Sequence, residues 1–479
     1  MPTPTLETPR LLLQPLALED AAQVQELFPH WDIVRHLNAI VPWPYPDDGA
    51  LTFFRDVALP ATERGDEWHW TIRLKSDATQ LVGCINLKRT GDENRGFWLA
   101  LPWHGRGLMT EAADAVTDFW FEVLKFPVLR VGKAIGNTAS RRISEKQGMR
   151  LVELVERDYV SGRAPAEIWE MTADEWRARK IAKARVLLSR HFDTTPLVHS
   201  HAFSRADCDA YLKNETVLPT ASFKVRGAVY ALSTNVARRA IGEVVAASTG
   251  NHGAAVAFAG RLLGVPVRVF LPDNPNPVKA GRIRDQGAVV VEAGADLSAA
   301  IEAASDYSTR TGAFFLHDAA DPDIPIGPAT IGAEIVDQLP DVATVYVPMG
   351  DTALIRGVAS ALKLHRRPIG VVGVAAAEAP AYYLSWRAGT VIETDAANTI
   401  ADGLAVRRPL ATNVAAIREL VDDVVTVSEQ ELMDAMVLLE SREGIVAEPA
   451  GAAATAALLK QPQRSGATVV LVTGANRRT

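Results

Sequence analysis

The 479-residue chain has few cysteines, no surplus of positive charge and no long hydrophobic run. Cys84 and Cys208 stand far apart, which excludes a disulfide framework or a cysteine-rich metal site, and both are interpreted as small packed residues. The net charge of -7 gives no general attraction to nucleic acid or to an anionic membrane. No run approaches the roughly 18 apolar residues of a membrane span, and the first residues, MPTPTLETPR, hold no apolar signal segment. We therefore expect a cytoplasmic protein with neither nucleic acid nor membrane as a partner.

The composition changes along the chain. Nine of the ten tryptophans lie between Trp31 and Trp176, whereas the alanine-rich stretches AAVAFAGRLLG and AGAAATAALL occur only later. A chain of this length exceeds a single ordinary core. Residues 174–190 read as a charged helix that would couple two domains stiffly. The sequence therefore predicts one domain over residues 1–175 and a second over residues 176–479.

The first domain contains a possible phosphate-binding turn. Strands are predicted over residues 68–74, 81–87 and 97–103, and the last is followed by His104-Gly105-Arg106-Gly107 and a helical pattern. Glycines at such a turn let several backbone N–H groups point at one spot before a helix N-terminus, which suits a phosphate or pyrophosphate. An ordinary tight turn explains the same residues equally well.

Downstream residues favour the phosphate interpretation. Residues 6–173, which include NTASRRISEKQGMRLV, resemble the GCN5-related N-acetyltransferases (GNAT), particularly the branch that acetylates the N-termini of ribosomal proteins. The resemblance implies the mixed α/β GNAT fold and acetyl-CoA as cosubstrate. The first and last positions of the turn depart from the family's Q/R-x-x-G-x-G/A pattern. The residues implied to bind acetyl-CoA are His104, Gly105, Arg106, Gly107, Leu108, Met109, Asn137 and Ser140.

Acetyl transfer also needs a base for the incoming ammonium and an acid for the leaving thiolate. Glu67 and His69 belong to a strand that could face the acceptor, and Ser140 could supply a proton through water. Each of these residues also fits a structural role. Acetyl-CoA binding is thus the prediction for this domain, with its catalytic residues open.

The second domain reads as a mostly parallel sheet covered by helices on both faces. Short apolar runs, each ending in a turn, alternate with helical stretches. In such folds ligands gather at the carboxyl ends of the strands. The runs are VRVFLP, GAVVVEAG, ATVYVPMG, IGVVGVAAAE and ATVVLVTG.

Polar turns follow several of these strands, and one lysine stands in an apolar setting. Lys224 lies in LPTASFKVRGA and is either a surface lysine or a Schiff-base lysine, whose amine must be partly desolvated. The turn STGNHG, residues 248–253, could hold a carboxylate at a helix N-terminus, and VPMGDTALIRG could hold a phosphate in the same way. A further strand ends on Thr473.

Together these motifs resemble the fold-type II pyridoxal-phosphate (PLP) enzymes, which include threonine and serine dehydratases, serine racemase and their synthase relatives. The resemblance covers residues 181–479, with TIADGLAV and GIVAEPAGAA as further matching strings. It implies a tryptophan-synthase-β-like fold of two lobes, a homodimer formed through this domain, and Lys224 as the residue covalently linked to PLP. The implied PLP-binding residues are Phe223, Lys224, Asn251, Gly350, Asp351, Thr352, Ala353, Leu354, Glu448 and Thr473. The implied substrate-carboxylate residues are Ser248, Thr249, Gly250, Asn251 and His252.

The reaction type follows from two implied roles. The neutral hydroxyl of Thr473 against the pyridine nitrogen weakens the ring as an electron sink and favours loss of a β substituent over transamination. Lys224 removes the Cα proton, and Thr249 could protonate the opposite face, which would allow some racemisation.

Two departures from the family matter. The phosphate loop, GGGG in dehydratases, is Gly350-Asp351-Thr352-Ala353 here, and Asp351 either turns away as a helix cap or faces the substrate and selects a cationic side chain. Glu378 matches the first ligand of the family's divalent-cation site, but the downstream aspartate is replaced, so no metal is predicted.

The sequence predicts an ammonia-lyase acting on a threonine- or serine-like β-substituted amino acid, fused to an acetyl-CoA-binding domain. Plain dehydration leaves no amine to acetylate, so the alternatives stay open. The lyase half could be a β-replacement synthase or a racemase, with the first domain acetylating a related amine or hydroxyl. The first domain could instead be a non-catalytic acetyl-CoA sensor.

Overall fold

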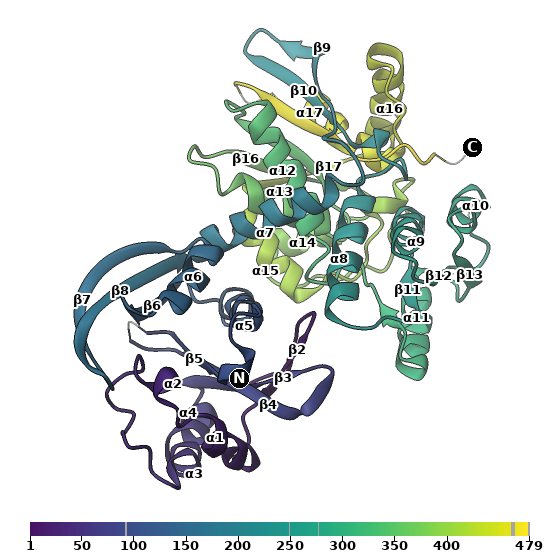
Figure 1. Ribbon diagram of the computed structural model, residues 1–479. Helices are drawn as coiled ribbons and strands as arrows, with labels where there is room; N and C mark the ends of the chain where they lie inside the picture. Colours follow the sequence, from purple (N-terminus) through teal and green to yellow (C-terminus); the bar gives the residue numbers. More distant parts are fainter. Residues whose placement is uncertain (92, 249, 276, 461–464, 478–479) are drawn as a thin grey trace. The chain divides into compact units, whose positions relative to one another are not determined.

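The computed structural model describes residues 1–91, 93–248, 250–275, 277–460 and 465–477. They form two compact units, the first of residues 1–179 with 237–239 and the second of residues 180–236 with 240–479. The change of unit falls within the helix α7 (Ala173–Leu188), as does the domain boundary expected after residue 175 (Figure 1). Among the described residues no helix is both long and apolar enough to cross a membrane.

The first unit contains a five-stranded antiparallel sheet, ordered β1-β2-β3-β4-β5, and a three-stranded sheet, ordered β6-β8-β7. The sheets meet at Asn94, whose backbone N–H donates to the carbonyl of Arg130 and whose Oδ1 accepts the N–H of Arg130, each at 2.8 Å. The strands are Leu6–Glu7 (β1), Leu11–Pro15 (β2), Glu67–Leu74 (β3), Asp77–Lys88 (β4), Arg95–Leu99 (β5), Val128–Ala134 (β6), Arg150–Tyr159 (β7) and Gly162–Thr172 (β8).

One expected strand of this unit is too long. The segment 97–103 is a strand only as far as Leu99, and Leu101–Trp103 form a 3₁₀ turn, because Pro102 has no N–H to continue the ladder. The helices are Ala21–Leu27 (α1), Trp31–Val34 (α2), Gly49–Phe53 (α3), Leu59–Arg64 (α4), Leu108–Asp118 (α5) and Thr138–Gln147 (α6), with 3₁₀ turns at 18–20 and 101–103 and π turns at 54–58 and 119–123.

The second unit contains the expected parallel sheet, with order β17-β16-β15-β18-β10-β9. Only β9, at the edge, runs antiparallel to its neighbour. Along β15 the side chain of Tyr346 packs into the core with α17, while Val345 and Val347 pack into the core with α12 and α13. Burial of both faces explains why this strand reads as a continuous apolar run. The strands are Leu197–Arg205 (β9), Cys208–Asn214 (β10), Thr344–Pro348 (β15), Gly370–Ala376 (β16), Asp423–Val427 (β17) and Thr468–Val472 (β18).

A smaller parallel sheet, ordered β13-β12-β11-β14, makes the second lobe of this unit. In β11, Val244 and Ala246 pack toward α8 and α9, whereas Val245 and Ala247 pack toward α11. The strands are Val244–Ala247 (β11), Val267–Leu271 (β12), Val289–Glu292 (β13) and Phe314–Phe315 (β14).

The helices of the second unit cover both sheets (Figure 1). They are Lys224–Arg238 (α8), Asn251–Leu263 (α9), Pro277–Asp285 (α10), Leu297–Thr311 (α11), Ile326–Gln338 (α12), Ala353–Leu362 (α13), Ala381–Ala388 (α14), Ala411–Leu420 (α15), Glu429–Glu443 (α16) and Pro449–Lys460 (α17), with 3₁₀ turns at 215–217 and 402–404.

A buried set of charges fixes the start of α8. The guanidinium of Arg226 donates from Nε to Glu215 Oε2 at 2.7 Å and from NH1 to Glu334 Oε1 at 2.5 Å. Lys213 Nζ donates to the other oxygen of Glu334 at 2.7 Å. All four side chains are buried. Two cations therefore balance two anions, and β10, the 215–217 turn, α8 and α12 are joined through them.

Substituting Arg226 with Met should strongly destabilise the second unit, because Glu215 and Glu334 would then lie buried without their main partner. Removing one member of a buried ion pair typically costs about 3–5 kcal/mol. Urea unfolding followed by circular dichroism would show a lower midpoint. The control is Arg387→Met, an exposed arginine of α14 bonded to Tyr383, expected to change stability by less than about 0.5 kcal/mol. Equal midpoints for the two variants would contradict the role of the buried charges.

Candidate active site

Lys224 is the first residue of α8, and its amine meets two carboxylates. Nζ contacts Asp318 Oδ2 and lies 2.7 Å from Asp351 Oδ2. The three side chains are 13%, 17% and 20% exposed. The backbone N–H of Lys224 donates to Ser222 Oγ at 3.2 Å, and Nζ lies 5.2 Å from the centre of the Phe223 ring. The amine is therefore desolvated and held at the N-terminal end of α8, where it faces the two carboxylates.

Lys224, Asp318 and Asp351 shift one another's pKa through their charges. Burial alone would lower the pKa of Lys224, but the carboxylates of Asp318 and Asp351 outweigh burial and raise it. Burial and the neighbouring Asp351 raise the pKa of Asp318. Burial would also raise the pKa of Asp351, yet contact with Lys224 lowers it. At neutral pH Lys224 is thus an ammonium, and Asp318 is the carboxylate nearest to accepting its proton.

The turn after β11 carries the expected carboxylate-binding residues. Ser248 is buried, and its Oγ accepts the N–H of Gly250 at 2.9 Å. His252 is buried, with Nε2 3.0 Å from the carbonyl of Leu316 and Nδ1 3.4 Å from Asp318 Oδ1. Thr249, predicted as a proton donor, lies outside the described residues. The start of α9 and the Lys224 amine therefore lie in one site, linked through Asp318.

The turn between β15 and α13 keeps the tight backbone that a phosphate loop needs. A Cβ on Gly350 would lie 2.1 Å from the carbonyl oxygen of Gly403, so a larger residue cannot fit. Thr352 has φ +75°, a conformation that glycine adopts more readily, and Ala353 and Leu354 are buried at the start of α13. Asp351 caps the helix, since Oδ1 accepts the N–H of Ala353 at 2.9 Å, and its Oδ2 faces Lys224.

A chain of polar side chains joins the other expected residues. Asn251 Nδ2 donates to Glu448 Oε1 at 2.5 Å, and Asn251 Oδ1 accepts from Asn476 Nδ2 at 2.7 Å. Thr473, at the end of β18, is buried, and its carbonyl accepts the N–H of Phe223 at 3.0 Å. The end of β18 is thereby held against the segment that carries Lys224.

These residues fit pyridoxal phosphate, which the sequence resemblance implies. Lys224 offers a buried amine, Thr473 a buried hydroxyl, and Gly350 a turn with no room for a side chain. Glu448 Oε2 is buried and has no hydrogen-bond partner among the described residues. An acceptor in that state indicates a polar group still to be bound, since buried polar atoms are nearly always bonded.

Some residues of this site were not predicted. Asp318 follows the short strand β14, and no turn motif marks it in the sequence. Lys279 of α10 is buried, contacts Asp402, and lies 4.0 Å from Glu448 Oε2. Asp402 lies within TIADGLAV, so that string was the available signal. Glu378 is exposed, and no group of three or more metal-ligating side chains occurs in the described part of the chain.

The first unit holds the expected acetyl-CoA turn between Trp103 and α5. Gly105 and Gly107 have φ values of +74° and +75°, and Gly107 caps the helix without a side chain. The turn is braced, because Arg10 NH1 donates to the carbonyl of Arg106 at 3.0 Å and His104 Nε2 lies 2.7 Å from the carbonyl of Leu99. Leu108 and Met109 are buried at the start of α5. The N–H groups of this helix start remain available for an anion.

The other motif residues of this unit lie at a second helix start. Asn137 is the N-cap of α6, and its Oδ1 accepts the N–H of Ser140 at 3.1 Å. Lys133 is buried beneath the same helix and contacts Ser144. Burial, with the nearby charge of Arg95, lowers the pKa of Lys133 to about 7. Asn137 therefore has a structural role as a cap.

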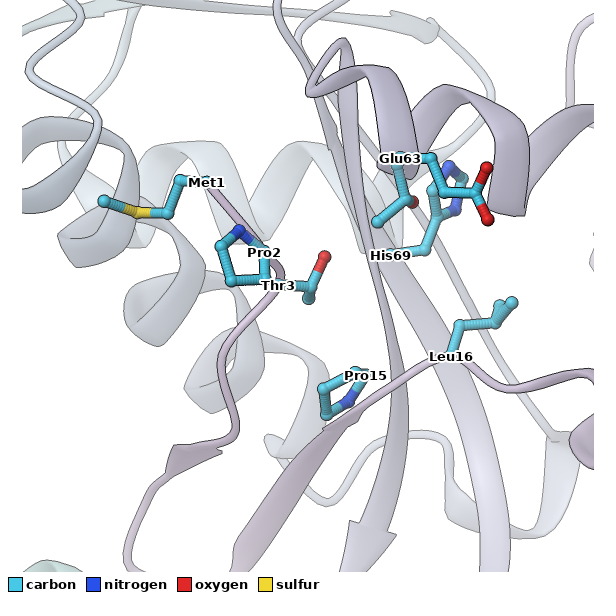
Figure 2. A pocket seen from close by; sticks show the side chains of 8 residues that line it. Met1, Pro2, Thr3, Pro15, Leu16, Glu63 and His69 are labelled. Atoms are coloured by element: carbon cyan, nitrogen blue, oxygen red, sulfur yellow. The ribbon is translucent and has the colours of Figure 1, made fainter.

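Glu67 and His69 form a pair at the start of β3, with His69 Nε2 2.7 Å from Glu67 Oε2. His69 also lines a hollow whose walls include Glu63 of α4 and the chain's first three residues (Figure 2). Its lining residues are Met1, Pro2, Thr3, Pro15, Leu16, Thr62, Glu63 and His69. His69 thus lies at a surface hollow, and Glu67 is bonded to His69 at the opposite end of β3 from Leu74.

Comparison with known proteins gives a match for each unit. Residues 188–474 match the model of the pyridoxal-phosphate dependent enzymes, and residues 10–150 match that of the acetyltransferase (GNAT) domain. An L-threonine ammonia-lyase of Geobacter sulfurreducens is 38% identical over 299 residues, which is 62% of this chain and 74% of that protein. The catabolic L-threonine dehydratase of Escherichia coli K12 is 35% identical over 62% of this chain and 92% of its own length.

Solved structures agree with these matches. A threonine deaminase from T.th. superposes with a TM-score of 0.59 at 31% identity, over 62% of this chain and 98% of that one. Maize serine racemase gives a TM-score of 0.58 at 28% identity, over 62% of this chain and 93% of its own.

Replacing Glu448 with Gln should change how stability depends on pH. Burial raises the pKa of Glu448 to about 7, against the opposing charge of Lys279, so its stabilising contribution is present below its unfolded pKa and is lost as pH rises through 7. Relative to the variant, the wild type should lose about 3 kcal/mol between pH ~4.5 and ~7. Urea unfolding across this range measures the difference. Glu431→Gln should show the opposite sign, because bonds to Ser428 and Lys460 outweigh partial burial and lower the pKa of Glu431. A pH-independent difference for Glu448→Gln would contradict the prediction.

Gly107→Val should abolish acetyl-CoA binding, measured by calorimetry on the full chain. A β-branched residue at φ +75° is strained and would displace the N–H groups of the turn. The matched control is Gly148→Val, at the end of α6, where φ is +80° and nothing lies within 4 Å of the added Cβ. That variant carries similar strain away from the turn and should retain binding. Unchanged affinity in Gly107→Val would remove the turn from the binding site.

Proposed function

We propose that this chain is an ammonia-lyase for small β-substituted amino acids, joined to an amine acetyltransferase. The chain belongs to the pyridoxal-phosphate dependent enzymes, and a GNAT domain precedes its pyridoxal-phosphate domain. Both family predictions made from the sequence are confirmed, and the chain is a PLP lyase of the threonine ammonia-lyase type with acetyl-CoA as cosubstrate of the first domain. The particular amino acid and the roles of the single residues are part of the proposal.

One observation carries the proposal for the second domain, the buried amine of Lys224 between two carboxylates. Bound pyridoxal phosphate supplies an electron sink for the bonds at the substrate Cα. The turn at Gly350, the hydroxyl of Thr473 and the carboxyl of Glu448 would hold it. Lys224 would bond to it covalently and, when free, take the Cα proton.

Proton movement within the site follows from the charges. A lysine held as an ammonium is neither nucleophile nor base, so Lys224 must first release a proton. Asp318, whose pKa is raised by burial and by Asp351, is the acceptor in contact with it. The start of α9 would bind the substrate carboxylate through its free N–H groups and through Ser248.

The reaction type is proposed as β-elimination. A neutral hydroxyl at Thr473 would leave the cofactor ring poorly protonated, which favours loss of a β substituent over transamination. Relatives named threonine ammonia-lyase and threonine deaminase support this choice. The likeness to a serine racemase keeps racemisation as a second activity, in which Thr249 would donate the proton.

Two further expectations belong to the proposal. The second domain would form a homodimer, and the protein would act in the cytoplasm on free amino acids. In the first domain, the turn from His104 to Met109 would bind acetyl-CoA, and an amine would accept the acetyl group.

Lys224→Ala should lose all PLP-dependent turnover and the covalent link that borohydride reduction traps in the wild type. Release of 2-oxo acid measures turnover, and mass spectrometry of the reduced protein measures the link. Lys460→Ala, which changes an exposed lysine paired with Glu431, serves as control and should keep both properties. Residual turnover in Lys224→Ala would exclude the proposed role.

A further inference from the structure

Two carboxylates converge on one amine in the PLP domain, and they come from separate parts of the fold. Asp318 follows β14 in the smaller lobe, and Asp351 precedes α13 in the larger one. Neither belongs to α8, which carries Lys224. A single carboxylate would suffice to pair one ammonium, so the second is not needed to balance Lys224 itself.

Arg356 and His252 also lie near this cluster, and neither donates a hydrogen bond to its two carboxylates. The guanidinium of Arg356 donates to Thr352 Oγ1 and to the carbonyl of Ala319, each at 3.1 Å, so its bonds are directed away from the carboxylates. Burial, with the charge of His252, lowers the pKa of His317, which is therefore neutral. His252 Nδ1 lies 3.4 Å from Asp318 Oδ1, which is too far for a well-formed hydrogen bond to this oxygen.

Asp318 has an unused oxygen. Its Oδ1 is buried and has no hydrogen-bond partner among the residues that the structure describes. Both oxygens of Asp351 are used, one by Ala353 N–H and one by Lys224. A buried carboxylate oxygen without a hydrogen-bond partner is costly unless a further donor, such as an ammonium, binds there.

We propose that Asp318, helped by Asp351, binds an ammonium on the substrate's β carbon, so that the lyase prefers a 2,3-diamino acid to serine or threonine. This rests on the β-elimination proposed above. When Lys224 is bonded to the cofactor it is no longer a free ammonium. Once Asp318 has passed the proton from Lys224 on to solvent, both carboxylates can pair with another cation. Asp318 contacts Nζ, the atom that takes the Cα proton, and therefore lies within reach of a group on the adjacent β carbon.

The leaving group gains from this pairing. An amine leaves as neutral ammonia only if it is protonated when the Cβ–N bond breaks, and a nearby carboxylate keeps it protonated. The Cα–H bond breaks with its proton going to Lys224, its electron pair forms the Cα=Cβ bond, and the Cβ–N pair departs with ammonia. The released enamine adds one water and loses its second amine. The balance is one diaminopropionate and one water giving one pyruvate and two ammonia.

The fused acetyltransferase is a separate observation that points the same way. Dehydration of serine leaves no amine to acetylate, whereas a diamino acid has a second amine that a GNAT domain could acetylate. Acetylation would remove the positive charge that Asp318 and Asp351 bind. The two domains would then compete for one class of substrate.

The experiment compares L-2,3-diaminopropionate, L-serine and L-threonine on the full-length holoenzyme. We expect a kcat/KM at least about tenfold higher for diaminopropionate, as a charged hydrogen bond contributes, and two ammonia per pyruvate. Asp318→Asn should slow turnover of both substrates, because Asp318 accepts the proton of Lys224, but it should raise KM for diaminopropionate about tenfold or more beyond any rise in KM for serine. Asp351→Asn should act in the same direction, and Asp422→Asn, at a carboxylate paired with Lys363, should leave both substrates unaffected.

Binding is measured separately from turnover, by the change in cofactor absorbance when each amino acid is titrated into the holoenzyme. Tighter binding of diaminopropionate, lost in Asp318→Asn, supports the proposal. Equal or tighter binding of serine, or an equal loss for both amino acids in Asp318→Asn, overturns it. If diaminopropionate binds tightly but no amino acid yields a 2-oxo acid, the β-elimination has failed while the ammonium site stands. If serine is turned over and diaminopropionate is not preferred, only the ammonium site has failed.

Discussion

The amine of Lys224 can act only if the first turn of α8 is held still, and the buried charges around Arg226 hold it. Arg226 lies two residues after Lys224 and is bonded to Glu215 and Glu334, which belong to different elements of the fold. Such a network specifies a position more than it adds stability, because desolvating four charges costs about as much as their attraction returns. The network therefore determines where the reacting amine lies relative to the turns after β11 and β15.

Asp318 and Asp351 change what this positioned amine can do. The family resemblance implies glycines in the loop after β15, whereas here a carboxylate in that loop faces the lysine. Arg356 also lies near this carboxylate, and burial lowers the pKa of Arg356 despite the charge of Asp351. Two carboxylates at the lysine suit a positively charged substituent better than a neutral hydroxyl. The difference should be observed as a preference for a charged over a neutral substrate.

The two domains have chemistries that constrain each other. A PLP lyase needs a free α-amine, and an acetyltransferase consumes free amines. Both can act on one class of compound only if it has more than one amine, or if the acetylated group is not the one that the lyase needs. The hollow beside His69 and the turn at Gly107 belong to the first unit alone, so the acceptor chemistry of that unit can be studied through its own residues.

The sequence by itself determined the two families and the parallel sheet, and it pointed to Lys224 as the lysine proposed to bind the cofactor, because these depend on local strings. PTASFKVRGA, STGNHG and the strand runs each specify a turn and the element that follows it. Tertiary structure alone decided the partners of Lys224. Asp318 is 94 residues away along the chain and follows a two-residue strand, and no local pattern reports which side chains meet across two lobes. It also decided the contacts of Asp351, whose one oxygen accepts a helix N–H while the other faces the amine of Lys224.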